Sequence, residues 1–259
     1  MTFPALLLSS KVLASPAAVS AALKVQAASS SHPVPTLSVG DLQRLDAGEV
    51  VRLRTPSAEG GAIGALGLLI TDLSAKDLWM GTLDPHGRLP SDIRMHALPG
   101  VGDELYRWYG FVDLPAPLKD RHFLVRTTID TPMAARSQGS IWERSWGLEK
   151  GWPQAMRPLI DSGQIADMDV EHFDDAIPTP VNQGTWTVLD LRDGRSLLAY
   201  QVATALGGDL PDGPLNRYLY WTLNDVLTGV VNTARTMSQH YVTGHDPLIG
   251  GDGKAIATY

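Results

Sequence analysis

One stretch near the end of the chain, residues 212–241, dominates its hydrophobic pattern. Apolar side chains recur there in steps of three and four residues, the spacing of one face of an α-helix. They are Leu215, Leu219, Leu223, Val226, Val230, Ala234, Met237 and Tyr241. Asp212 suits the N-cap, and Pro214 suits the first turn, where a missing N–H costs nothing. The pattern predicts a helix on the order of 40 Å long whose apolar face must lie on a large apolar surface.

Upstream of this helix, short apolar segments alternate with turn residues, which is typical of antiparallel strands joined in order along the chain. The predicted strands are residues 50–54, 62–70, 93–98, 104–112, 122–129, 140–148, 185–191 and 196–204. A helix is expected to begin at Ser74, because Asp77 can complete a capping box with it, and to close one end of the sheet. The sequence therefore predicts an α+β fold, in which a curved antiparallel sheet wraps around the long helix.

Residues 149–183 break the strand pattern. The segment contains four prolines and a cluster of acidic residues, which predicts a long surface excursion with one short strand at residues 168–173. Its acidic residues resemble a calcium loop only superficially, because His172 stands where such a loop needs glycine. One open hypothesis is that the acidic segment 161–175 meets a basic protein partner.

Composition narrows the classes of function. The 259 residues carry a formal charge of −7 without a cluster of Lys and Arg, which argues against nucleic acid as a partner. The chain has no cysteine, and no apolar run is long enough to span a membrane. Motifs of serine hydrolases, zinc proteases and nucleotide-binding loops are missing, so we expect no metal, no cofactor and no catalytic residue.

The first 36 residues are rich in Ala, Ser and Pro, and their apolar runs faintly resemble an export signal. The n-region lacks a positive charge, however, and Lys11 and Lys24 interrupt the apolar residues. A short helix or a disordered tail is the alternative. The cytoplasm is therefore slightly favoured, with export or a periplasmic location left open, and the oligomeric state does not follow from the sequence.

Two motifs flank the predicted strands in a recognisable order. Residues 114–123 read LPAPLKDRHF, residues 207–211 read GGDLP directly before the long helix, and a late strand begins at residues 184–186. Together they resemble signatures of the START domain, the lipid-transfer branch of the helix-grip superfamily. The resemblance implies a helix-grip domain over residues 41–241, with residues 1–40 as a tail or export segment and residues 242–259 as a C-terminal tail.

The resemblance also implies a hydrophobic cavity between sheet and helix, roofed by the loop before the central strand. In this chain the loop contains Leu114, Pro115, Pro117 and Leu118, which we expect to act as a gate. Asp120 and Arg121 follow as a structural anchor, with Arg121 expected to clamp carbonyls or a carboxylate.

Side-chain alternation along the strands selects candidate ligand contacts. Phe123, Val125 and Thr127 share one face of their strand, which leaves Arg126 on the opposite face. Some START domains bury an arginine on this strand to meet a polar group of the ligand, and here Thr127 stands where that charge is expected. The other candidates are Trp142 and Trp146, which share a face, Tyr200 on the last strand, and Leu219, Leu223 and Val226 on the long helix.

These observations predict a protein that binds a hydrophobic small molecule, a lipid or a sterol-like compound, for transport or sensing, with transient membrane contact left open. A polyketide cyclase or aromatase on the same scaffold is the enzymatic alternative. Such an enzyme needs acid or base groups inside the cavity, whereas the inward positions identified above are mostly apolar. The sequence therefore favours binding over catalysis, without deciding the question.

Overall fold

The computed structural model describes residues 16–58, 62–83, 93–99, 106–114, 116, 118–205, 207 and 212–259, apart from the side chains of residues 57, 58, 93, 99 and 212–219. Its centre is one sheet whose neighbouring strands run antiparallel in the order β1-β2-β9-β8-β6-β5-β4-β3. The strands are β1 (Val51–Ala58), β2 (Ala62–Thr71), β3 (Ile93–Pro99), β4 (Tyr106–Val112), β5 (Arg121–Ile129), β6 (Ile141–Leu148), β8 (Val181–Asp190) and β9 (Ser196–Ala205). A short strand, β7 (Ile177–Pro178), pairs with the start of β5 in parallel.

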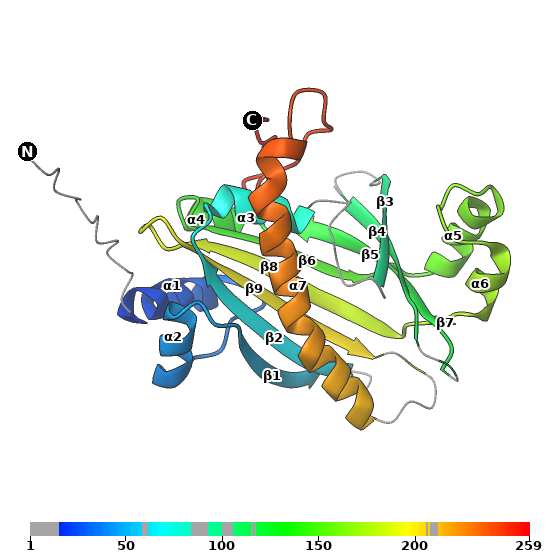
Figure 1. Cartoon of the computed structure of the whole chain (residues 1–259), viewed down its shortest axis with the longest axis horizontal. Helices are drawn as coiled ribbons and strands as arrows, with labels where there is room; N and C mark the ends of the chain where they lie inside the picture. The colour runs from blue at the N-terminus through cyan, green and yellow to red at the C-terminus, as the bar shows by residue number, and fades with distance from the viewer. Residues whose placement is uncertain are drawn as a thin grey trace, which may run out of the picture.

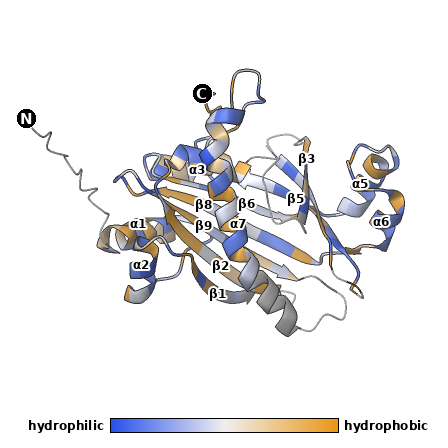
Figure 2. Cartoon of the chain, viewed as in Figure 1, coloured by the Kyte–Doolittle hydropathy of each residue, from blue (hydrophilic) through white to orange (hydrophobic). Residues whose placement is uncertain are grey.

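The long helix is α7 (Asp212–His240), and it crosses one face of the sheet (Figure 1). The α+β helix-grip arrangement expected from the sequence is confirmed. Helix α3 (Ala75–Leu83) packs beside α7, and Ser74 caps it by accepting the amide hydrogen of Asp77 at 3.1 Å. Orange apolar stripes follow the strands beneath α7 in Figure 2, while the helix itself alternates between apolar and polar residues. We call this covered side of the sheet the inward face.

The outward face is covered at one end by two N-terminal helices, α1 (Pro16–Ser29) and α2 (Val39–Asp46) (Figure 1). Val19 and Leu23 of α1 are buried against the sheet. The amide of Gln26 donates to the buried carboxylate of Glu143 at 3.0 Å, and Thr187 donates to the same carboxylate at 2.9 Å. Residues 16–40 are therefore packed onto the domain, which corrects the expectation of a tail there; residues 1–15 lie outside the described residues.

The 149–183 segment also differs from its prediction. It forms α5 (Trp152–Asp161) and α6 (Val170–Asp175), so the strand expected at residues 168–173 is wrong. Asp169 caps α6 by accepting the amide hydrogen of His172 at 2.8 Å, which stabilises a helix over the acidic stretch. The segment is more than a surface excursion, because its apolar side chains pack on the outward face over β4 and β5. These side chains are Trp152, Met156, Ile160, Ile165, Met168 and Phe173.

The C-terminal residues pack across the end of α3 and α7, which corrects the expectation of a tail at residues 242–259. Tyr241 donates its hydroxyl hydrogen to the carbonyl of Ile256 at 2.6 Å and accepts the amide hydrogen of Leu248 at 3.0 Å. Trp79 of α3 donates to the carbonyl of Ile249 at 2.9 Å. These hydrogen bonds join the C-terminal loop to Tyr241, at the end of α7, and to α3. A helix with the length and apolar content to cross a bilayer does not occur among the described residues.

Candidate ligand-binding face

Three aromatic side chains form a row across the centre of the inward face. Trp146 of β6 stacks on Tyr200 of β9 with ring centroids 5.5 Å apart, and Trp186 of β8 lies 4.2 Å from the same tyrosine ring. The indole N–H of Trp146 donates to the side-chain oxygen of Asn182 at 2.9 Å, which fixes the ring orientation. This aromatic row faces Leu223 of α7.

Two side chains of this row are less completely covered than their neighbours on the same face. Trp146 and Tyr200 are half-buried, although they stand on interior strands of the sheet and on the side that α7 covers. On the same side of β9, Leu198 and Val202 are 0% and 5% exposed. The partial exposure on the inward face is therefore local to Trp146 and Tyr200.

The predicted candidates on β5 lie on the inward face, toward the 114–120 loop. Phe123 and Val125 are buried in a cluster that includes Trp108, Leu114 and Trp146. Thr127 is buried beside Trp146 in register and donates its hydroxyl hydrogen to the carbonyl of Tyr106 at 3.0 Å. Arg126 is exposed on the other side of the strand, as the alternation predicts.

The two tryptophans of β6 have different surroundings. Trp142 packs edge-on against Trp79 with ring centroids 5.6 Å apart. A Cβ placed on Gly251 would lie only 2.3 Å from Trp142, so the C-terminal loop rests directly on its ring. Trp142 is therefore packed between α3 and the C-terminal loop, whereas Trp146 lies in the aromatic row.

Helix α7 contributes Leu223 and Val226, which are 1% and 7% exposed and face the sheet. The side chain of Leu219, the third candidate on this helix, lies outside the described residues. The helix thus supplies an apolar surface opposite the aromatic row.

Sequence reasoning missed one charged residue on the inward face, Arg144. It stands between Trp142 and Trp146 on the same side of β6, and in register it pairs with Ile129 and Trp186. Its side chain is only 5% exposed and donates to the carbonyl of Thr82 at the end of α3. The alternation that places both tryptophans inward also places Arg144 inward, so the signal was present in the sequence.

The electrostatic surroundings of Arg144 are unusual. Burial lowers the pKa of Arg144 to about 10, and the hydroxyl groups of Tyr106 and Tyr200 act in the opposite direction. Burial also raises the pKa of both tyrosines, so each hydroxyl stays neutral at neutral pH. Around Arg144 the inward face thus holds a cation and two neutral hydroxyl groups, and this part of the face is less apolar than the sequence predicted.

Hydrogen bonds of Asp120 and Arg121 hold the end of the loop that precedes β5. The carboxylate of Asp120 accepts the amide hydrogen of Leu114 at 2.9 Å. Buried Arg121 donates to the carbonyls of Lys119 and Gly207, the latter at 3.0 Å. Arg121 therefore joins the two motifs, DRHF and GGDLP, on which the START resemblance rests. Of the four gate candidates, Leu114 is half-buried and Leu118 is 41% exposed, while Pro115 and Pro117 lie outside the described residues.

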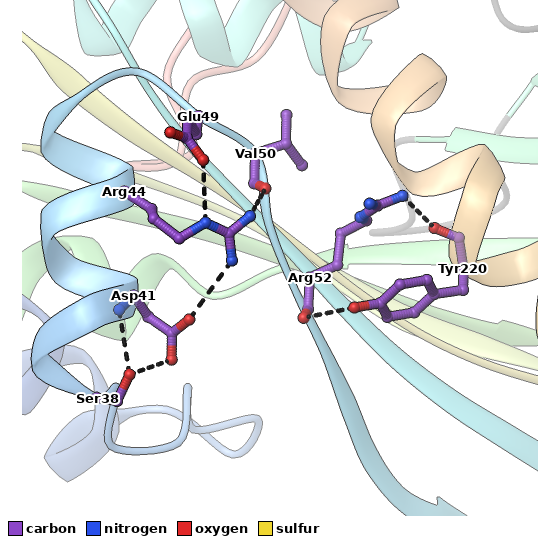
Figure 3. Close-up of polar contacts among 7 residues, drawn as sticks. All are labelled: Ser38, Asp41, Arg44, Glu49, Val50, Arg52 and Tyr220. Atoms are coloured by element: carbon purple, nitrogen blue, oxygen red, sulfur yellow. Dashed lines mark hydrogen bonds and ion pairs between the residues drawn. The ribbon is translucent and has the colours of Figure 1, made fainter.

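Helix α7 is tied to the edge strand β1 by a reciprocal pair of hydrogen bonds, drawn in Figure 3. Arg52 donates to the carbonyl of Tyr220 at 3.3 Å, and the Tyr220 hydroxyl donates to the carbonyl of Arg52 at 3.1 Å. The guanidinium also lies 4.7 Å from the Tyr220 ring centre and 5.3 Å from that of Trp221, which is 62% exposed. These contacts hold the first half of the helix against the sheet.

Comparison with known proteins identifies the fold. No family model and no curated protein matches the chain. Solved structures do match: human StAR-related lipid transfer protein 5 has a TM-score of 0.56 at 13% identity, over 85% of this chain and 97% of that one. A STAR-related lipid transfer protein from Xanthomonas axonopodis gives 0.52 at 14% identity, over 72% and 93% of the two chains. Human STARD10 gives 0.51 at 12% identity, over 73% and 74%. The chain therefore has the helix-grip fold of the StAR-related lipid transfer domains.

Proposed function

We propose that this protein binds a hydrophobic small molecule, a lipid or sterol-like compound, between α7 and the inward face, and carries or senses it. The observation that supports the proposal is the partial exposure of Trp146 and Tyr200 beneath a helix that would otherwise bury them. Aromatic and aliphatic walls with few polar groups are typical of sites for such ligands. The lipid transfer proteins of the same fold make a lipid the first class of ligand to test.

The expected driving force is burial of apolar ligand surface. At about 25 cal/mol per Å², a ligand that buries about 300 Å² gains about 7 kcal/mol before the costs of association. Phe123 and Val125 offer apolar contact at one end, and the aromatic row offers it at the centre. Ligand entry requires movement of the 114–120 loop or of the first half of α7, because both cover this face.

Replacing Trp146 by alanine should reduce ligand loading to a third or less of the wild-type level, because the largest half-buried apolar surface of the site is lost. Native and denaturing mass spectrometry of the same purified sample measures the fraction of protein with bound ligand. Val39→Ala is the control, because Val39 is 71% exposed on α2, which lies on the outward face. Equal loading of the two variants would contradict the assignment of Trp146. A wild-type protein that neither retains host lipid nor binds added fatty acid, sterol or phospholipid would contradict the proposed function.

Tyr220→Phe should accelerate ligand exchange about fivefold. The substitution removes one hydrogen bond, worth about 1 kcal/mol, between α7 and β1 while keeping the ring over Arg52. Stopped-flow fluorescence of a displaced apolar probe measures the rate. Tyr259→Phe serves as control, since it removes a hydrogen bond to Asp77 at the other end of α7. If both variants exchange at the wild-type rate, opening of the first half of α7 does not limit entry.

A cyclase-like enzyme on the same scaffold is a second candidate, and the positions of Arg144 and Tyr200 on the inward face favour it. Ring closure requires groups that donate protons or stabilise enolate oxygens, and these two residues carry the required hydrogens. Chromatography and mass spectrometry of a bound aromatic polyketide, before and after incubation, test the candidate. Recovery of unchanged ligand favours carriage, whereas conversion that Tyr200→Phe slows favours the enzyme.

A further inference from the structure

We propose that the bound molecule carries a carboxylate, that Arg144 binds this group, and that the apolar tail extends from there along β5 and β6 toward the 114–120 loop. The inference rests on the proposed function and specifies the class of ligand. It starts from a charge that is buried without an opposite charge among the described residues.

Among the described residues, Arg144 lacks the carboxylate partner that the half-buried Arg107 and Arg195 have, and it makes fewer hydrogen bonds than the buried Arg121, which donates to three carbonyls. Arg107 forms two 2.7 Å hydrogen bonds with the carboxylate of Glu149, and Arg195 pairs with Asp46 and Asp193 at 3.1 and 2.9 Å. For Arg144, by contrast, no carboxylate lies within 4.0 Å among the described residues. Its one hydrogen bond goes to a main-chain carbonyl, and its Nε is buried without a partner.

A buried cation without an anion is costly, because the protein interior replaces neither its hydration nor its countercharge. A carboxylate would supply both, since its two oxygens match the fork of N–H groups on a guanidinium. One carboxylate also balances one guanidinium, whereas a phosphate monoester would leave excess negative charge in the same apolar surroundings. The neutral hydroxyl of Tyr200, close to Arg144, can donate a further hydrogen bond to the same group.

The strand register determines where the rest of the ligand would lie. From Arg144 the inward positions of β6 continue to Trp146 and Leu148. The inward positions of β5 beside them run from Ile129 back to Phe123, over about 20 Å at 3.3 Å per residue, and end in the cluster that contains Leu114. A carboxylate at Arg144 therefore places a fatty acyl or polycyclic tail on the apolar part of the face, with its far end at the 114–120 loop.

Fluorescence titration with cis-parinaric acid and with its methyl ester tests the proposal. Both probes brighten in apolar sites, and only the acid carries the charge. Wild-type protein should bind the acid about tenfold more tightly than the ester. Arg144→Met should abolish this preference by weakening the acid alone, and Arg144→Lys should retain part of it. Arg126→Met, which removes the same charge from the exposed side of the neighbouring strand, should behave as wild type.

These measurements test the carboxylate site separately from the proposed function. Equal affinity of wild type for acid and ester overturns the carboxylate site and leaves the proposed function intact. Binding of neither probe also overturns the carboxylate site, and the proposed function then falls if sterol and phospholipid fail to bind as well. A preference that survives in Arg144→Met assigns the carboxylate to another residue and overturns the role of Arg144. The comparison of the two probes on wild type decides the ligand class even if a variant fails to fold.

Thermal unfolding without ligand distinguishes this role from a structural one. If Arg144 serves only to hold the end of α3 through Thr82, Arg144→Met should unfold at a clearly lower temperature. If it is a ligand anchor, removing an unpaired buried charge should leave the midpoint unchanged or raise it. A large loss of stability together with an unchanged acid preference would overturn the proposal.

Discussion

Acidification from pH 6.5 to pH 4 should lower the free energy of unfolding by about 3 kcal/mol through one side chain, His122. This histidine is the second residue of β5, points to the outward face and is 2% exposed. The rings of Trp152 and Phe173, from α5 and α6, lie 4.7 and 4.9 Å from it. Helices α5 and α6 therefore cover the imidazole of His122, which can titrate.

The sign of the effect follows from the surroundings of the imidazole. Its Nδ1 lies 3.1 Å from the hydroxyl oxygen of Tyr109, and its Nε2 is buried without a partner. Burial among aromatic rings lowers the pKa of His122 from 6.5 to about 4, because the charged form loses its hydration. The unfolded chain binds the proton first, so the stabilisation is complete above pH 6.5 and is lost as the pH falls to 4.

Urea unfolding of wild type and His122→Phe at several pH values measures the effect. Phenylalanine keeps the aromatic contacts and removes the titration, so the variant should show a flatter slope between pH 6.5 and 4, and any deficit in stability relative to wild type at pH 6.5 should shrink or reverse at pH 4. Burial lowers the pKa of His96 as well, and that residue remains in both proteins. Asp72 and Asp169 have pKa values below 3.8 and act mainly at lower pH. Equal slopes for the two proteins would show that His122 is solvated.

Regular periodicity explains which elements the sequence predicted. The apolar steps through Leu223, Val226 and Val230 predicted α7 to within a residue of its end, because a helix of eight turns averages over local irregularities. Strand alternation placed Phe123, Val125 and Thr127 on the inward face for the same reason. Patterns repeated over many residues are therefore a sound guide in this chain.

Hydrophobic periodicity did not reveal the short helices or the contacts between residues that are far apart in the sequence. Helix α5 carries the apolar residues Trp152, Met156 and Ile160 at four-residue steps, but Pro158 and the surrounding glycines obscured them. The burial of Gln26 depends on Glu143, 117 residues away, so no local pattern can show that α1 belongs to the domain. The C-terminal loop over Trp142 is a contact of the same kind.

Arg144 is a different case, because its position did follow from the pattern. The alternation that turned Trp142 and Trp146 inward applies equally to the residue between them. A single charged residue among apolar neighbours is easily assigned to the solvent side, since charges are seldom buried. Its burial is therefore informative about function, and it reopens the enzymatic alternative that an apolar face had disfavoured.

Gly184→Ala should destabilise the protein by about 3 kcal/mol, a large effect for one added methyl group. A Cβ at this position would lie 2.2 Å from the carbonyl oxygen of Gln201 and 2.3 Å from the ring of Trp146. The first contact is with backbone and the second with a ring fixed by Asn182 and Tyr200, so neither neighbour can move without losing its own contacts. The glycine is required because the indole of Trp146 lies directly against β8 at this position.

Gly147→Ala is the matched control, because it adds the same methyl group to the neighbouring strand β6, where nothing lies within 4 Å. That variant should equal wild type or exceed it slightly, since alanine restricts the unfolded chain. Combining Gly184→Ala with Trp146→Ala should recover only part of the lost stability, because the contact with Gln201 remains. Equal unfolding midpoints for Gly184→Ala and Gly147→Ala would show that Trp146 is not seated on Gly184, and the aromatic row would then need another position on the inward face.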